Sequence, residues 1–130
     1  MKRFVEDIEE LTEENQDFRR VLYTGKHLQL VLMSLKAGEE TGEGVHMDHD
    51  QFFRIEKGKG EVVIAGDRVK VGKDDAVIVP AGLRHKVINT GQKAMKLFMI
   101  YGPPHDPEVI ASLDHQGDGE VAKAEGDGEP

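Results

Sequence analysis

The chain of 130 residues contains no cysteine, which excludes disulfide bonds and metal sites built on thiolates. A transition metal would therefore depend on imidazole and oxygen ligands. Basic residues are also scarce, since 17 lysines and arginines stand against 25 aspartates and glutamates and leave a formal charge of −8. This balance argues against a nucleic-acid partner, because phosphate binding needs clustered Lys and Arg side chains.

Long apolar runs are missing as well. No segment approaches the roughly 20 apolar residues that a membrane-spanning helix needs, and the first residues lack the apolar core of a secretory signal. We therefore expect a soluble, cytoplasmic protein with no membrane partner. A chain of this length fits one domain that buries its own core without disulfides.

The two ends of the chain differ in composition from its middle. Residues 106–130 end in a run rich in acidic residues and glycine, which buries too little apolar surface to offset its ordering entropy, and we predict a mobile tail. Residues 1–17 form an acidic lead-in with apolar side chains at Val5, Ile8 and Leu11. That spacing allows a short helical turn or an irregular segment, which we expect on the outside of the domain.

The middle of the chain, residues 18–105, has the pattern of an all-β domain. Short β-branched runs alternate with glycine-rich turns, and this favours a sandwich or a closed barrel over a helical fold. Eight strands are predicted, at Phe18–Tyr23, Leu28–Leu35, Phe52–Ile55, Glu61–Ile64, Arg68–Val71, Ala76–Val79, Lys86–Ile88 and Lys96–Tyr101. A jelly roll, or double-stranded β-helix, closes most of their edges. Within it we predict a hairpin whose turn centres on Gly66-Asp67.

The predicted strand that begins near Gln51 carries the first candidate site residues. Strand alternation sends Gln51, Phe53 and Ile55 into the interior. The residues between them face outward: Phe52, Arg54 and Glu56. Strict alternation would place His49 on the inner face, and a bulge just before the strand would bring His46 inward as well.

A second candidate element lies about forty residues further along. Pro80 and Gly82 predict a sharp corner, and His85 follows it at the start of a strand. Two such elements on neighbouring strands would aim several ligand atoms at one point. The pattern indicates a metal site inside a small β-barrel.

These residues resemble the two motifs of the cupin superfamily. The segment Pro80–Asn89 matches Pro-x-Gly-x-x-His followed by three residues and Asn, with Asp74 in place of the glycine that opens the motif. The first motif is altered, because Asp48 stands where a second histidine is usual and Gln51 where a glutamate is usual. The resemblance covers roughly residues 28–101 and is greatest to small single-domain cupins grouped with mannose-6-phosphate isomerase and related sugar-modifying proteins.

The resemblance implies a divalent metal ion in the barrel, either zinc, iron, manganese, nickel or cobalt. The implied ligands are His46, His49, Gln51 and His85, with Asp48 or Asp50 as alternates. Each has a simpler interpretation. His46 and His85 would hydrogen-bond to backbone, His49 would face solvent in another strand register, and Gln51 would be a buried amide bonded to a neighbouring strand.

Other residues complete the predicted pocket. Gln29, Phe53 and Tyr101 are expected to line it, and His49 and His105 are candidate proton donors at its rim. Three arginines are candidates for binding the anionic group of a phosphorylated sugar: Arg19, Arg20 and Arg54. Arg54 is predicted to point outward, where a surface ion pair is the stronger interpretation.

Two classes of function remain open on this pattern. One is a metal enzyme, either an isomerase or epimerase acting on a sugar or sugar phosphate, or a metal-dependent dioxygenase. The other is a binding module that holds a sugar or an anion without catalysis, which the missing glutamate favours, although a metal enzyme is the expectation overall. In either case the expected partner is a small molecule. The resemblance also implies a homodimer, formed through the outer sheet.

Overall fold

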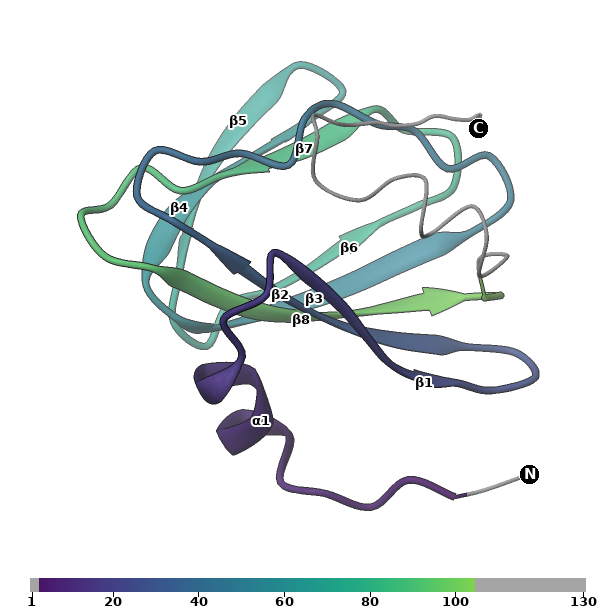
Figure 1. Ribbon diagram of the computed structural model, residues 1–130. Coiled ribbons are helices and arrows are strands. Elements are labelled where there is room, and N and C mark those ends of the chain that lie inside the picture. Colours follow the sequence, from purple (N-terminus) through teal and green to yellow (C-terminus); the bar gives the residue numbers. More distant parts are fainter. Residues whose placement is uncertain (1–2, 105–130) are drawn as a thin grey trace.

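The computed structural model describes residues 3–104, which form one short helix and eight strands (Figure 1). The helix is α1 (Ile8–Glu14), and the strands are β1 (Arg19–Thr24), β2 (Gln29–Leu35), β3 (Asp50–Lys57), β4 (Lys59–Ile64), β5 (Asp67–Gly72), β6 (Ala76–Val79), β7 (His85–Ile88) and β8 (Met95–Gly102). All eight predicted strands are therefore present, and five of them are longer than predicted, by one to four residues. The predicted tail, residues 106–130, and His105 lie outside the described residues.

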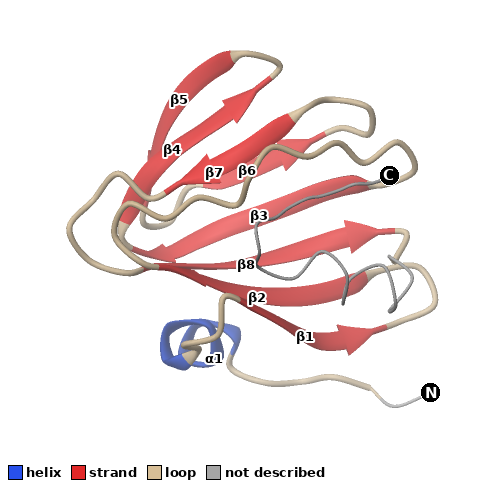
Figure 2. Ribbon diagram, turned by 45° about the horizontal axis from the view of Figure 1, so that its top comes forward, coloured by secondary structure: helices blue, strands red, loops and turns tan. Residues whose placement is uncertain are grey.

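The strands form two antiparallel sheets that face each other (Figure 2). The larger sheet has the order β1-β2-β8-β3-β6 and the smaller one the order β5-β4-β7. Strand β8 pairs with both β2 and β3, so the last strand joins the two halves of the larger sheet. This arrangement is the predicted jelly roll. No helix of residues 3–104 is long and apolar enough to cross a membrane.

The hydrophobic core lies between the two sheets. Alternation along β3 places Phe53 and Ile55 in it, each with 0% of its surface exposed, and leaves Gln51 on the same inner face. Alternate residues of β8 and β2 continue this inner face across the same sheet, and β4, β5 and β7 supply valines from the opposite sheet. The predicted inward face of β3 is confirmed.

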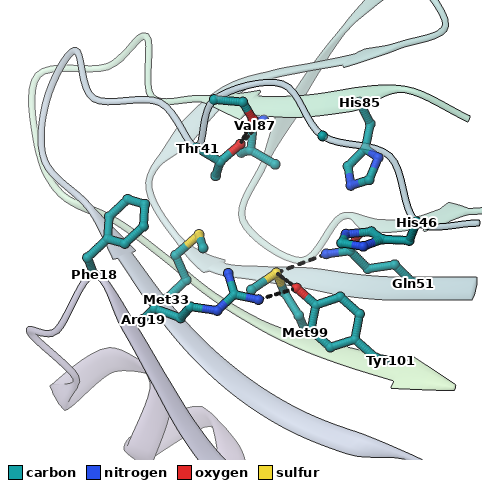
Figure 3. Close-up of a pocket in the computed structure, with 12 residues that line it drawn as sticks. Phe18, Arg19, Met33, Thr41, His46, Gln51, His85, Val87, Met99 and Tyr101 are labelled. Atoms are coloured by element: carbon teal, nitrogen blue, oxygen red, sulfur yellow. Dashed lines mark hydrogen bonds between the residues drawn. The ribbon is translucent and has the colours of Figure 1, made fainter. Parts of the chain in front are cut away.

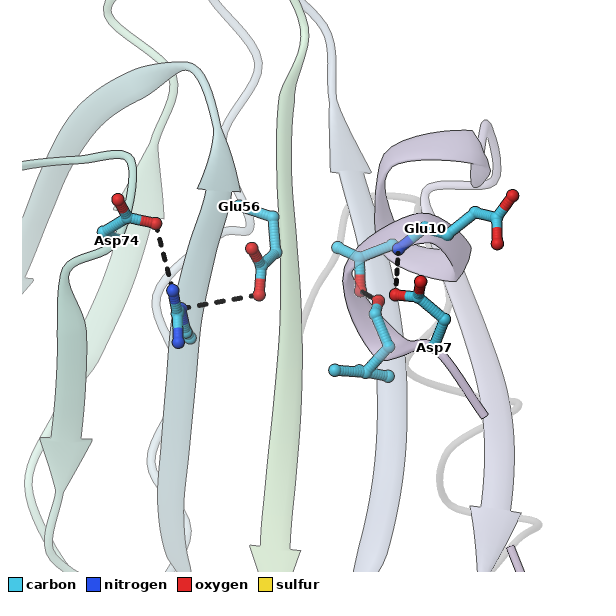
Figure 4. Close-up of polar contacts among 7 residues, drawn as sticks. Asp7, Glu10, Glu56 and Asp74 are labelled. Carbon is cyan, nitrogen blue, oxygen red and sulfur yellow. Dashed lines mark hydrogen bonds and ion pairs between the residues drawn. The ribbon is translucent and has the colours of Figure 1, made fainter. Parts of the chain in front are cut away.

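The N-terminal segment packs on the outer face of the larger sheet. Its helix α1 begins at an N-cap, Asp7, whose carboxylate accepts a hydrogen bond of 3.1 Å from the backbone N–H of Glu10 (Figure 4). Ile8 and Leu11 then pack against a buried cluster on the sheet that includes Leu30 and Phe98. Of the two alternatives expected for this segment, the helical turn is the one that forms, and it lies on the outside of the barrel as expected.

This helix changes the environment of an outward-facing acid. Glu56 was expected at the surface, but α1 lies against β3 and β8 and Glu56 is only 3% exposed. Burial raises the pKa of its carboxyl above the ordinary 4.5, and Arg54, with Nε 3.5 Å from Glu56 Oε2, opposes the shift. Arg54 also binds Asp74 at 3.0 Å (Figure 4), so the surface ion pair predicted for it is confirmed.

Left-handed backbone sets two of the turns. The β4–β5 turn consists of Ala65 (φ 50°) and Gly66 (φ 89°), and Asp67 is already the first residue of β5, so the predicted turn was one residue too late. Gly58 (φ 89°) separates β3 from β4, where an added Cβ would lie 2.8 Å from the carbonyl oxygen of Ala94. A residue other than glycine would meet both backbone strain and a clash at that turn.

Candidate functional site

A pocket opens between the two sheets and encloses about 530 Å³, open solvent at its mouth included. Polar side chains from four elements and one loop converge on it (Figure 3), and they are Arg19, Thr41, His46, Gln51, His85 and Tyr101. Apolar side chains and two glycines complete its wall.

His85 reaches the pocket from the first position of β7, directly after the predicted corner. Gly82 takes up φ 92° in that corner, which a side chain would disfavour. The Nδ1–H of His85 donates to the carbonyl oxygen of Leu83 at 3.1 Å, so its Nε2 carries the free lone pair. Burial lowers the pKa of His85 below its ordinary value, although the bond to Leu83 opposes this shift. The side chain is thus held as the neutral imidazole that binds metals.

A bulge at the start of the strand had been expected to bring His46 inward. His46 instead comes from the loop before β3. Its ring centre lies 5.2 Å from that of His85 and 5.4 Å from that of Tyr101. Its carbonyl oxygen accepts a hydrogen bond of 2.8 Å from the N–H of Gly82, which ties this loop to the corner before β7. A backbone contact between the two motif segments therefore brings the two histidines together.

Gln51 lies on β3 beside His46 (Figure 3) and is 4% exposed. Its Nε2 donates to the sulfur of Met99 at 3.1 Å, and its Oε1 is buried without a hydrogen-bond partner among the described residues. Leaving a buried acceptor unsatisfied costs about 1–3 kcal/mol. The amide oxygen is therefore suited to a cation or to a donor from a ligand.

The remaining predicted ligands do not join this group. His49 is not among the lining residues; its ring centre is 6.1 Å from that of His46, and its Nδ1 contacts the carbonyl oxygen of Pro103. Asp48 is exposed. Asp50 is also exposed, and its Oδ1 accepts a hydrogen bond of 3.0 Å from the N–H of Ala81.

The residues that do converge form a donor set without a carboxylate. Across residues 3–104, no group of three or more His, Asp or Glu side chains is arranged to hold a metal ion. His46, His85 and Gln51 instead offer two imidazole nitrogens and one amide oxygen. Such a set fits a divalent cation by the chemistry of its donors. It holds the cation less tightly than a set with a carboxylate, because it contributes no negative charge.

The other end of the pocket is cationic. Arg19 on β1 donates from an Nη atom to the hydroxyl oxygen of Tyr101 at 2.7 Å, and Figure 3 shows the two side chains meeting beside Met99. Tyr101 is 1% exposed and lines the pocket as predicted. Arg20, the next residue along β1, is exposed. Of the three arginines considered for anion binding, only Arg19 lines the pocket.

Some predicted residues lie behind the pocket, and others that line it were not predicted. Gln29 and Phe53 are fully buried in the barrel but are not among the lining residues. Phe18 lines it from just before β1, although it had been predicted as the first residue of that strand, and Thr41 lines it from a loop, where alternation gives no indication of direction. The hydroxyl of Thr41 accepts from the N–H of Val87 at 3.1 Å and donates to the carbonyl oxygen of Gly42 at 3.0 Å.

Two antiparallel sheets closed around a pocket of this kind define the protein as a double-stranded β-helix, a small jelly-roll barrel. The cupin-domain family model matches residues 31–101, and the chain therefore belongs to the cupin family. The uncharacterized protein YrkC of Bacillus subtilis is 46% identical over 112 residues, which are 82% of this chain and 60% of YrkC. The chain thus spans about 60% of the length of that relative.

Solved structures agree with this assignment. The crystal structure of BH2720 from Bacillus halodurans has a TM-score of 0.80 and 43% identity, and the match covers 82% of this chain and 85% of that one. KdgF from a Halomonas species has a TM-score of 0.64 at 20% identity, over 69% of this chain and 81% of its own. The second likeness shows the fold alone.

Proposed function

We propose that this cupin binds a small, polar, anionic molecule in its pocket with the help of a divalent metal ion. One observation carries the proposal: three neutral donors, from His46, His85 and Gln51, lie in a pocket whose other end is the cation Arg19. No aspartate or glutamate of residues 3–104 lines this pocket, although the chain carries a formal charge of −8. A site that is neutral to positive inside an acidic protein is suited to an anion.

Each side chain has a definite part in this proposal. His85 would bind the metal through Nε2, because its Nδ1–H is engaged by the carbonyl oxygen of Leu83. Gln51 would bind through Oε1, its unsatisfied buried acceptor. His46 would supply the second imidazole. A metal held in this way keeps open positions and polarises a bound carbonyl or hydroxyl oxygen.

A second candidate is catalysis by the same site. An isomerase or epimerase for a sugar or sugar phosphate needs a proton donor or acceptor near the bound oxygen. His49 is the nearest described candidate, with its ring centre 6.4 Å from that of Tyr101. A dioxygenase would need a redox-active ion at the same position. The lining residues that the structure describes include no carboxylate that could act as a base, and this favours binding over proton abstraction.

The experiment is a measurement of metal content by mass spectrometry on the full chain, first stripped with a chelator and then reconstituted at neutral pH. We expect about one divalent ion per chain. His85→Ala should lower the metal affinity at least tenfold, while His27→Ala, a change at an exposed histidine, should leave it unchanged. A wild-type protein without metal, or two variants with equal affinity, would overturn the metal proposal. Bound iron would favour oxygen chemistry, and bound zinc or manganese would favour isomerisation or binding.

A further inference from the structure

The side chain of Arg19 lies in the pocket wall and makes one hydrogen bond to the described residues. That bond is the 2.7 Å contact with the Tyr101 hydroxyl, and its Nε is buried without an acceptor among the described residues. The ion pairs of residues 3–104 involve Arg54, Arg68 and Lys86 as the cations, and none includes Arg19. A guanidinium in this setting has donors left for an anion that residues 3–104 do not supply.

Other donors around the pocket are already in use. The N–H groups of Thr41 and Gly44 donate to the carbonyl oxygens of Val87 and His85, each at 3.0 Å. The Thr41 hydroxyl donates to Gly42. A phosphate group, with a charge near −2, is usually bound by several donors at once, whereas this end of the pocket offers one guanidinium. A single positive charge with a planar fork of N–H groups matches a carboxylate.

Tyr101 lies between the guanidinium and the histidines. Cζ of Arg19 is 5.8 Å from the centre of the Tyr101 ring, and the centre of the His46 ring is 5.4 Å from the same point. The Arg19 Cζ atom and the centre of the His46 ring are therefore no further apart than the sum of these two distances. A ligand that touches both ends is a compact molecule.

We infer that Arg19, held by Tyr101, is the carboxylate subsite of this pocket, and that the ligand is a small hydroxycarboxylic acid. Its carboxylate binds the guanidinium, and a hydroxyl or carbonyl oxygen at its other end faces His46, His85 and Gln51. The second half of this assignment rests on the proposed metal-assisted function. The first half rests on the arginine alone.

The test uses calorimetric titration of the full, zinc-loaded chain with two matched sets of probes. The first set is glycerate, glycerol and glycerol 3-phosphate, and the second is gluconate, glucitol and glucitol 6-phosphate. Within each set the hydroxyl groups are similar and the anionic group differs. We expect at least one carboxylate to bind ten times more tightly than its alcohol and its phosphate ester. Arg19→Met should abolish that preference, and Arg20→Met, at the exposed neighbour on the same strand, should retain it.

Tyr101→Phe supplies an intermediate variant, because it removes the acceptor that orients Arg19 but keeps the charge. We expect it to reduce the carboxylate preference severalfold. Melting curves and zinc affinity equal to wild type in Arg19→Met would show that the variant is folded and that its metal end is intact. Carboxylates that bind no better than the alcohols, a preference for the phosphate esters, or an equal loss in Arg20→Met would overturn the inference. Carboxylate binding that persists without any metal would overturn the proposed metal and leave the subsite standing.

Discussion

Replacing Gln51 with glutamate tests the most unusual feature of the site, its neutral donor set. Gln51 is 4% exposed, and its Nε2 donates to the sulfur of Met99. In Gln51→Glu this donor is lost, and burial disfavours the charged form of the new carboxyl in the absence of metal. We expect the metal-free variant to lose about 2 kcal/mol of stability, the middle of the range for an unsatisfied buried group. In a domain of this size that corresponds to a fall in melting temperature of roughly 10 °C.

Metal should reverse this loss. A ligand at 100 times its dissociation constant stabilises the folded state by about 2.7 kcal/mol, and a carboxylate beside His46 and His85 should bind zinc more tightly than the amide does. The variant is therefore expected to melt below wild type in chelator and to gain more from zinc than wild type gains. The assay is thermal unfolding followed by circular dichroism, in chelator and over a series of zinc concentrations.

Gln29 offers a matched control on β2, which β8 separates from β3 in the same sheet. It is also a buried, inward-facing glutamine whose Oε1 has no hydrogen-bond partner among the described residues, but it does not line the pocket. Gln29→Glu should be destabilised in chelator as well, and zinc should not restore it. Equal rescue of both variants, or a Gln51→Glu protein that gains no more from zinc than wild type does, would refute the assignment of Gln51 as a ligand.

The other predictions concern a buried acid, a tight turn and the oligomeric state. Since burial raises the pKa of Glu56, the folded state holds its proton more strongly than the unfolded state, and stability is lost as the pH rises from about 4.5 through the folded pKa. Urea unfolding should show this loss in wild type and not in Glu56→Gln, and a pH-independent difference between the two would contradict it. Gly58→Ala should cost more than the roughly 1–2 kcal/mol of left-handed strain, because its Cβ would also clash with the carbonyl oxygen of Ala94. Gly66→Ala is the control for strain alone, since Gly66 has the same φ of 89° but open space around its Cβ. Equal losses in urea would exclude a clash with Ala94. Sedimentation equilibrium is expected to show a homodimer at micromolar concentration. Ile78, which is 66% exposed on the outer face of β6, is a candidate contact. A monomer at that concentration would exclude the predicted dimer.

The strands and the inward face of β3 could be predicted because both depend on local rules. Glycine-rich turns separate the apolar runs, and period-two alternation places Gln51, Phe53 and Ile55 on one face. The exception among the turns is instructive. Ala65 adopts φ 50°, and nothing in its side chain distinguishes it from an alanine inside a strand.

The site could be predicted only where a strand carries it. His85 and Gln51 lie where their strands place them, but His46 is positioned by a loop whose path depends on backbone bonds to residues about forty positions away. Glu56 faces outward as alternation requires, and its burial depends on a helix that covers that part of the sheet. Contacts between segments far apart in the sequence decided both cases.

The loop that carries His46 is hydrogen-bonded to β7 and to Asn89 directly after it. Gly38, Thr41 and Gly44 donate their N–H groups to the carbonyl oxygens of Asn89, Val87 and His85, and the N–H of His85 donates back to Gly44. The loop is thus an irregular continuation of the smaller sheet. Opening it would break several backbone bonds at once, so this loop is expected to keep its side of the pocket mouth at a fixed width. We therefore expect diffusion and the size of the ligand, rather than movement of this loop, to limit ligand entry.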